Sequence, residues 1–391
     1  MKILALDQGE HMGGAERFFS ELLTHYADFS EHEITLLHDG SDDYRKLYQN
    51  SQVKLIHQDL PRLKPIGLRT FFRYRKSKKE LQEKIQEYKP DILISNTVRT
   101  HILVSKIASN LKIPLIWLGH DLTFPKFLLK KFLQHPRLIL CCSHFVKEHY
   151  SQFTEKKEKF QVMYPFGIES RQLRELIKRP KKKTFGMVGK WIPWKGQEQF
   201  IQLAKKIHDV RPMVSFTLVA SVYDGKKESL QYRDMCLQLI SKLGLEDSFS
   251  VQSHNPKIMR EMASWKGLIH SSIEPEPLGR VILEGMAAGC TVFAADQGGP
   301  REIIQQSSHC KSWVPSDPES VLEEIINIVD SDEVLKEADE WLKSNLTWKE
   351  QMKKFDVLVS QTIKAGFYGF RLYNFSAVFF SACSRAISSV G

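Results

Sequence analysis

Two glutamates flank a predicted helix start in the second half of the chain. Glu276 and Glu284 are eight residues apart, in a segment that follows an apolar strand pattern and opens an amphipathic helical pattern. Pro277 stands near the helix start, where its missing N–H costs little. Gly279 allows a ligand to approach the backbone closely. The free N–H groups at 278–281 therefore form an anion site that suits a diphosphate.

The spacing of the two carboxylates fits the groups that flank a diphosphate in a nucleotide sugar. Eight residues of helix place them on roughly the same side and about 10 Å apart. A sugar at one end and a ribose at the other both offer vicinal hydroxyls, which a carboxylate accepts well. Two glutamates at this spacing are also compatible with an ordinary helix whose acidic face is solvated. The surrounding segments favour ligand binding.

Two glycine-containing loops accompany this segment. The loop at 189–196 directly follows the first strand expected in the second half of the chain, and its Lys190 and Lys195 can reach the same diphosphate. Both lysines would neutralise charge on a departing nucleotide. Solvent-exposed loop lysines are the alternative interpretation. The segment at 298–302 also lies between a strand and a helix, and we expect it to form a second wall of the pocket.

The first half of the chain supplies two further candidates. Gly13 and Gly14 stand at a helix start, where backbone can approach a phosphate or a sugar, although the dinucleotide fingerprint G-x-G-x-x-G is absent. His120 ends an apolar strand, is followed by Asp121, and can hydrogen-bond a transferred sugar. A lone histidine in such a place is more often structural. Its assignment therefore depends on the other segments.

Short apolar runs alternate with amphipathic stretches along the chain, which predicts the α/β class. We expect strands at 2–7, 33–38, 53–57, 91–95, 114–118 and 137–142, and again at 184–188, 215–220, 249–252, 267–270 and 291–294. Nearly continuous apolar strands between helices indicate parallel sheets covered on both faces. The pattern predicts two Rossmann-like, doubly wound domains facing a central cleft, where ligands bind at the carboxyl ends of the strands.

The expected domain boundaries follow from breaks in this pattern. We assign 1–167 to an N-terminal Rossmann-like domain and 184–346 to a C-terminal Rossmann-like domain. Between them, 168–183 contains a proline inside a run of basic residues, which is typical of a linker. A helix is expected at 347–364, and the aromatic, apolar tail at 365–391 receives no role.

The composition bounds the class of partner. The 391 residues carry a formal net charge of +10, which favours nucleotides, phospholipid surfaces or nucleic acid. No helix-turn-helix, zinc finger or aromatic RNA-binding motif supports nucleic acid. Basic and aromatic residues are interleaved at 69–84 and 124–132. This pattern is compatible with docking on an anionic membrane and equally with amphipathic core helices that have solvated faces.

Cysteine usage and apolar runs bear on localisation. The six cysteines show no metal-ligand spacing and are interpreted as reduced core thiols. The N-terminus becomes polar too quickly for a signal peptide, and no apolar run reaches the ~18 residues of a membrane span. We therefore expect a cytoplasmic protein, with peripheral attachment to the inner face of the membrane as an option.

Together these segments resemble the retaining glycosyltransferases of family 4, which have the GT-B fold. The resemblance rests on G-G-A-E-R at 13–17, His-Asp at 120–121, the Lys-Gly loop at 189–196, E-P-x-G-x4-E at 276–284 and G-G-x-x-E at 298–302. These motifs occur in one register from about residue 2 to 360. The family usually has arginine where Lys190 stands, and lysine keeps the charge but loses the bidentate fork.

The resemblance implies a role for each candidate residue. Glu284 would hold the ribose hydroxyls, Glu276 the donor sugar, and His120 the transferred sugar. The implied catalytic residues are His120, Glu276 and Lys195. The implied donor-binding residues are Gly14, Lys190, Lys195, Glu276, Leu278, Gly279, Arg280, Val281 and Glu284.

The implied activity is transfer of a hexose, with retention, from a nucleotide-diphosphate sugar to a glycan or lipid-linked acceptor in cell-surface polysaccharide or glycolipid synthesis. UDP is favoured over GDP. The resemblance implies that no metal or other cofactor is needed. It also implies that the domain at 1–167 is the acceptor side, that the domain at 184–346 is the donor side, and that the helix at 347–364 would cross back to the first domain. The alternatives are a sugar-nucleotide epimerase on the same fold and a catalytically degenerate module that binds nucleotide sugar or membrane.

Overall fold

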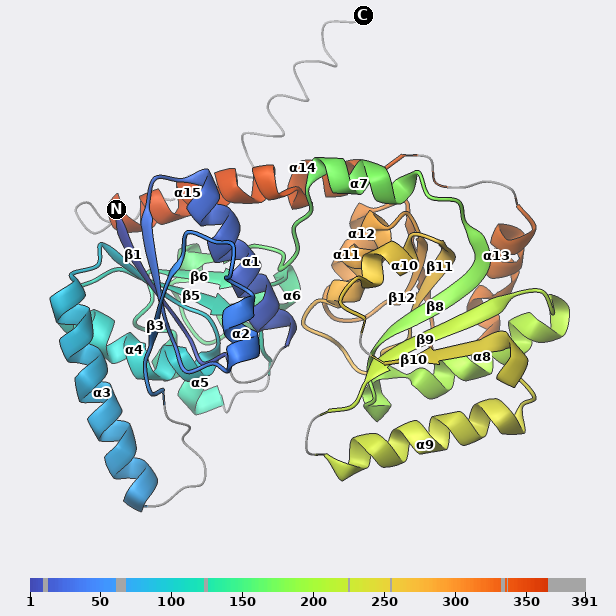
Figure 1. The fold of residues 1–391 in the computed structure, drawn as a ribbon, viewed down its shortest axis with the longest axis horizontal. Helices are drawn as coiled ribbons and strands as arrows, with labels where there is room; N and C mark the ends of the chain where they lie inside the picture. Colours follow the sequence, from blue (N-terminus) through green and yellow to red (C-terminus); the bar gives the residue numbers. More distant parts are fainter. Residues whose placement is uncertain are drawn as a thin grey trace, which may run out of the picture.

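The computed structural model describes residues 1–9, 13–60, 68–122, 126–223, 226–253, 255–331, 335 and 337–364. The expectation for the tail at 365–391 lies outside these residues. The described chain forms two α/β domains side by side, joined at the top of the view in Figure 1. The predicted fold class is confirmed, because each domain contains one parallel sheet with helices against it.

The N-terminal sheet has seven parallel strands in the order β3-β2-β1-β4-β5-β6-β7. The strand order reverses between β1 and β4, so the loops that follow these two strands diverge and leave a crevice at their carboxyl ends. The strands are β1 (Lys2–Asp7), β2 (Glu33–His38), β3 (Lys54–His57), β4 (Ile92–Ser95), β5 (Leu115–Gly119), β6 (Leu138–Cys141) and β7 (Phe160–Val162). The helices are α1 (Gly14–Phe29), α2 (Asp42–Lys46), α3 (Leu68–Tyr88), α4 (Val98–Leu111), α5 (Lys126–Phe132) and α6 (His144–Ser151).

The C-terminal sheet has six parallel strands in the order β10-β9-β8-β11-β12-β13, with its reversal between β8 and β11. The strands are β8 (Lys182–Lys190), β9 (Ser215–Ser221), β10 (Phe249–Gln252), β11 (Trp265–His270), β12 (Thr291–Ala295) and β13 (Cys310–Trp313). The helices are α8 (Gln197–Val210), α9 (Lys227–Lys242), α10 (Ile258–Met262), α11 (Arg280–Ala287), α12 (Gly299–Gln306) and α13 (Glu319–Asp330). The loops after β8 and β11 therefore diverge at this crevice.

Three details differ from the sequence expectation. The segment at 168–183 contains α7 (Ser170–Ile177) and the first two residues of β8, so its basic end pairs within the sheet. The linker prediction was wrong at Lys182 and Lys183, because both residues belong to β8, although their side chains are exposed as expected of a solvated basic run. The short strands β7 and β13 were not predicted, because each has only three or four residues and carries polar side chains.

The chain returns to the N-terminal domain through α14 (Glu340–Leu346) and α15 (Trp348–Lys364), which runs along the top of Figure 1. Trp348 stacks on His25 of α1 with ring centroids 4.1 Å apart. Phe355 meets Tyr26 edge to face at 4.8 Å and is fully buried. The last helix is therefore part of the first domain's core.

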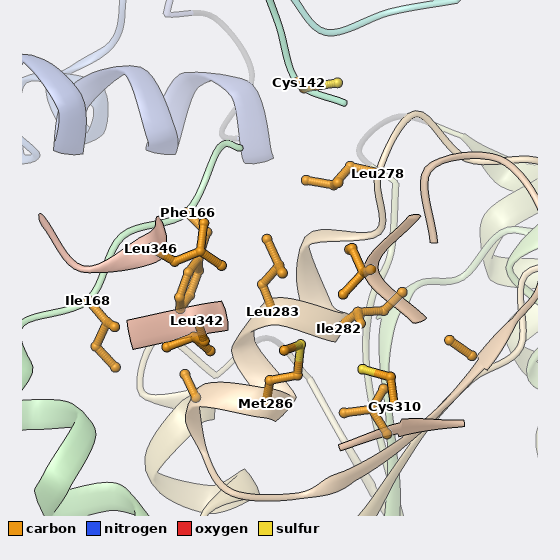
Figure 2. Close-up of a cluster of buried hydrophobic side chains, with 14 of the residues drawn as sticks. Cys142, Phe166, Ile168, Leu278, Ile282, Leu283, Met286, Cys310, Leu342 and Leu346 are labelled. Atoms are coloured by element: carbon orange, nitrogen blue, oxygen red, sulfur yellow. The ribbon is translucent and has the colours of Figure 1, made fainter. Parts of the chain in front are cut away.

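One apolar cluster continues through the domain junction. Figure 2 shows Phe166 and Ile168 of the connecting chain together with Leu342 and Leu346 of α14, all packed against the buried side of α11. The α11 side chains Ile282, Leu283 and Met286 are completely buried there. This packing fixes the position of α11, whose N-terminus points toward the N-terminal domain.

We predict that Phe355→Ala lowers the free energy of unfolding by about 3–5 kcal/mol, because it removes a buried ring that joins α15 to α1. Urea denaturation followed by circular dichroism measures the change. Lys353→Ala on the exposed side of the same helix is the control and is expected to stay within about 0.5 kcal/mol. Equal stability of the two variants would contradict the account of α15.

Candidate functional site

The N-terminus of α11 is built around a glycine. Gly279 has φ 81°, a left-handed conformation that side chains rarely adopt. A Cβ at this position would lie 3.2 Å from Nε2 of His270. The helix begins at Arg280, and the N–H of Ile282 donates to the Gly279 carbonyl at 2.9 Å. The N–H groups of Arg280 and Val281 have no carbonyl of a preceding turn to bind. The helix start that the sequence predicts is therefore present, and anion binding there stays a prediction.

Glu276 lies just before this helix and is 6% exposed. Its Oε1 accepts from Lys195 Nζ at 2.7 Å, from His270 Nε2 at 2.9 Å and from the hydroxyl of Ser272. Burial alone would raise the pKa of Glu276, but the charge of Lys195 and then His270 hold that pKa well below its usual range. The carboxylate is therefore ionised.

These contacts leave one oxygen of Glu276 for a ligand. All three donors bind Oε1, and no contact within the described part of the chain engages Oε2. Gly196 holds the Lys195 loop against β11, because a Cβ there would lie 1.9 Å from the Ser271 carbonyl oxygen. The sequence analysis did not predict a role for His270 or Ser272. Their position a few residues before the E-P-x-G segment was the signal that could have identified them.

Glu284 is held by an arginine that reaches across to the first domain. Arg280 Nε donates to Glu284 Oε1 at 3.0 Å, and its Nη2 lies 3.0 Å from Oε2 of Glu21 in α1. Arg280 Nη1 also donates to the carbonyl of Gly14 at 3.3 Å. The sequence assigned Arg280 only a backbone role, and its side-chain contact with Glu21 was not predicted.

A small pocket of about 90 Å³ opens beside Glu284. It lies at the carboxyl ends of β8 and β9 and is lined by Arg17, Val188, Gly189, Val219, Ser221, Asn255, Ile258 and Glu284. Ligand pockets typically hold about 300–1,000 Å³. The pocket is thus smaller than a typical ligand pocket, and Arg280 occupies the carboxylate of Glu284 at its side.

Lys190 and Lys195 both contact aromatic rings at this edge. Lys190 Nζ lies 4.7 Å from the ring centroid of Tyr223, and Lys195 Nζ lies 4.4 Å from that of Trp194. Burial raises the pKa of Glu16 in the first domain, and the charge of Lys190 has a smaller effect that lowers it. Lys190 therefore faces the N-terminal domain, whereas Lys195 is paired with Glu276.

His120 lies at the carboxyl end of β5 and is partly exposed. Burial lowers the pKa of its ring to about 4, so the imidazole is neutral near pH 7. Cys142 Sγ lies 3.8 Å from the carbonyl oxygen of His120 and 3.9 Å from that of Pro277. His120 and the segment containing Glu276 are thus neighbours across the domain boundary.

The Gly298-Gly299 segment packs on the backbone of the Glu276 loop. Gly299 N–H donates to the Glu276 carbonyl at 2.8 Å. The side chain of Glu302 turns instead to the first domain, where Oε2 accepts from the N–H groups of His144 at 2.8 Å and Phe145 at 3.3 Å. The segment supports the site from behind, and Glu302 joins the two domains.

A larger hollow of about 1,110 Å³ lies at the opposite edge of the second sheet. Two of its lysines are engaged by helix ends: Lys181 donates to Ala288 O at 2.8 Å and Lys266 to Ile328 O at 2.8 Å. Lys311 pairs with Glu324 at 3.1 Å. Lys181 and Lys266 therefore stabilise helix ends, and Lys311 is neutralised by Glu324. None of the predicted site residues lines this hollow.

The described residues include neither a metal-binding cluster nor a membrane-spanning helix. In this part of the chain, no group of three or more His, Cys, Asp or Glu side chains is placed to hold a metal ion. Within the same residues, no helix combines the length and apolar character needed to span a bilayer.

The sequence matches two family models that together cover both domains. Residues 12–166 match the model described as Glycosyltransferase Family 4, and residues 169–345 match the one described as Glycosyl transferases group 1. With two parallel-sheet domains facing each other, the molecule has the GT-B fold. The chain belongs with the family 4-like glycosyltransferases.

Solved structures share this fold over nearly the whole chain. HepE of Anabaena, in complex with UDP and glucose, aligns with a TM-score of 0.74 and 21% identity over 92% of this chain and 99% of its own. A glycosyltransferase of Rickettsia africae aligns with a TM-score of 0.76 and 18% identity over 93% of this chain and 98% of its own.

Curated relatives match a shorter region. Sucrose synthase 5 of Arabidopsis thaliana is 25% identical over 173 residues, which are 40% of this chain and 21% of that protein. Sucrose synthase 6 of the same plant is 26% identical over 174 residues, with 40% and 18% covered. The matched part of this chain thus spans about a fifth of these relatives.

We predict that Glu302→Gln stabilises the protein at high pH and not at low pH. Burial raises the pKa of Glu302 from 4.5 to about 7, so the folded protein binds this proton more tightly than the unfolded chain. The wild type therefore loses stability as pH rises through this range. Glutamine keeps an oxygen for the α6 N–H groups without a buried charge. Thermal unfolding should favour the variant near pH 8 and show the difference closing near pH 5; a difference independent of pH would contradict the assignment.

Proposed function

We propose that this protein transfers a hexose, with retention of configuration, from a nucleotide-diphosphate sugar to a glycan or lipid-linked acceptor. The observation that carries the proposal is the ionised Glu276, engaged through one oxygen by Lys195 and His270 and placed directly before the N-terminus of α11. The family models and a GT-B neighbour in complex with UDP-glucose support a nucleotide-sugar donor, with UDP favoured over GDP.

In this proposal the donor binds across the start of α11. The amides of Leu278, Gly279, Arg280 and Val281 and the ammonium groups of Lys190 and Lys195 bind the diphosphate. Glu284 accepts from the ribose hydroxyls after Arg280 releases it, and the pocket beside Glu284 receives the base. Gly14 approaches from the first domain, where its carbonyl already meets Arg280.

The chemistry then needs no nucleophile from the protein. The acceptor hydroxyl attacks the anomeric carbon on the face from which the diphosphate departs, so the new C–O bond forms as the bond to phosphate breaks. The acceptor proton passes to the departing phosphate oxygen, whose developing charge Lys190 and Lys195 stabilise. Glu276, held ionised, accepts from a donor-sugar hydroxyl through Oε2 and cannot serve as the proton donor.

A sugar-nucleotide epimerase on the same fold is the competing proposal. Nuclear magnetic resonance of the UDP-hexose distinguishes the two. A transferase releases UDP only when an acceptor such as a membrane glycolipid extract is added, whereas an epimerase changes the hexose without one. A degenerate binding module would do neither while still binding UDP.

A basic and aromatic surface on the first domain supports a membrane-bound acceptor. Phe71 and Phe72 on α3 are 53% and 65% exposed. Burial lowers the pKa of Lys78 on α3. The nearby charges of Lys106 on α4 and Lys131 on α5 lower this pKa further. In the described chain none of these three lysines has an acidic partner.

This surface, defined by those two phenylalanines and three lysines, fits a bilayer that contains anionic lipid. The lysines supply attraction to the headgroups and the rings supply apolar area for insertion. Phe71 and Lys78 are seven residues apart on one helix, so they share a face. We therefore propose peripheral attachment to the inner face of the membrane, with the acceptor reaching the cleft from the bilayer.

The donor proposal predicts that Glu284→Gln weakens UDP binding tenfold or more, because a charged acceptor of two ribose hydroxyls is lost (about 1.5–3 kcal/mol for each charge-assisted bond). Isothermal titration calorimetry measures the affinity, and Glu324→Gln at the far edge of the sheet is the matched control. We also expect EDTA to leave binding unchanged. Wild-type affinity in Glu284→Gln would remove Glu284 from the site, and loss of binding in EDTA would overturn the metal-independent proposal.

The membrane proposal predicts that wild-type protein co-sediments with vesicles of phosphatidylglycerol and phosphatidylcholine, and not with phosphatidylcholine alone. The variant Phe71→Ser, Phe72→Ser, Lys106→Glu, Lys131→Glu should lose most of this binding, since it removes both insertion and charge. Met213→Ser, an equally exposed apolar residue of the second domain, is the control. Undiminished binding by the fourfold variant would rule out this surface.

A further inference from the structure

The ring of His120 is held by a buried asparagine. His120 Nε2 lies 3.0 Å from Oδ1 of Asn96. Asn96 follows β4 and His120 follows β5, and these strands are parallel neighbours, so their carboxyl ends bring the two side chains together. Asn96 is 0% exposed, so it cannot itself touch a substrate.

The Asn96 amide lies beside Asp7 at the carboxyl end of β1. Asp7 is completely buried, and its Oδ2 accepts from the hydroxyl of Tyr44 at 2.8 Å. Burial raises the pKa of Asp7 to about 7, while the Tyr44 hydroxyl and the nearby Asn96 amide act to lower it. Asp7 Oδ1 and Asn96 Nδ2 have no hydrogen-bond partner in the described chain, so the carboxylate acts on the amide through its charge, which favours the NH₂ group on its own side and the oxygen toward His120.

The orientation of Asn96 determines which nitrogen of His120 carries the proton. Because Asn96 offers only its oxygen, His120 must donate from Nε2. The ring is neutral, since burial lowers its pKa to about 4. Its Nδ1 is then unprotonated and can only accept a hydrogen bond.

We propose that Asn96, oriented by Asp7, is a positioning residue that fixes His120 with its proton on Nε2 and presents Nδ1 as an acceptor to a hydroxyl of the transferred sugar. The inference rests on the proposed function, in which His120 contacts that sugar. It adds two adjacent hydrogen-bonded pairs, Tyr44–Asp7 and Asn96–His120, of which only His120 is partly exposed. A purely structural role of these pairs would stabilise the fold without selecting a tautomer.

The tautomer is measured on the unmodified protein. Labelling with ¹⁵N-histidine and recording long-range ¹H–¹⁵N spectra at about pH 8, where Asp7 is ionised, distinguishes a protonated Nε2 from a protonated Nδ1. His120→Gln assigns the signal by its disappearance. We expect the proton on Nε2. A proton on Nδ1 would overturn the proposal, whether or not any donor is turned over.

A mutant cycle tests whether Asn96 acts through His120. We expect Asn96→Ala to lower kcat about tenfold, the loss that follows from leaving one buried partner unsatisfied, while the UDP dissociation constant changes less than twofold. In a His120→Ala background the same change should have no further effect on kcat. Asn50→Ala, an exposed asparagine, is the control.

Two outcomes of the cycle would contradict the positioning role: additive losses in the double variant, or an equal loss of UDP affinity in Asn96→Ala. If Asn96→Ala does not fold, the tautomer measurement on wild type decides. If the wild type binds no nucleotide sugar, the proposed function fails, and the tautomer of His120 is still determined independently.

Discussion

The site depends on one buried charge and its partners. An ionised carboxylate inside a protein is costly unless it is paired and hydrogen-bonded, and Glu276 meets this condition through Lys195, His270 and Ser272. The partners come from the loop after β8 and from the end of β11, which are the two strands at which the order of the second sheet reverses. The fold thus gathers these groups at the sheet's crevice. Removing Lys195 would leave the charge of Glu276 largely uncompensated.

Arg280 links the proposed donor site to the contact between the two domains. Arg280 binds Glu284 on its own helix and Glu21 on the first domain. In the proposed binding mode the ribose and Arg280 compete for the same carboxylate, so a bound nucleoside would change the partners of the residue that joins the domains. Glu302 makes a separate connection to α6 on the side of the site where the Gly298-Gly299 segment packs. A few charged contacts thus join the two domains beside an apolar junction.

Sequence patterns predicted much of the fold because its central strands are nearly continuous apolar runs. β4 and β6, for example, are buried at every position. The edge strands β7 and β13 were missed because short segments with polar residues lack that signal. Among site residues, Glu276 and Glu284 were recognisable from a glycine-containing helix start.

The residues missed by sequence reasoning share a physical cause. Glu21 meets Arg280 across 259 residues of chain, and Asn96 meets His120 only because β4 and β5 pair. Such partners depend on tertiary geometry, which residue type and spacing do not encode. The roles proposed for the donor-binding residues follow from the placement of these groups around α11 together with the family resemblance.

A crystal structure with UDP tests the central claim most directly. The account predicts a diphosphate within hydrogen-bond distance of the first-turn amides of α11, ribose hydroxyls on Glu284 in place of Arg280, and Glu276 Oε2 facing the position of the missing sugar. UDP bound away from α11, or bound while the Arg280–Glu284 pair stays intact and excludes the ribose, would contradict it.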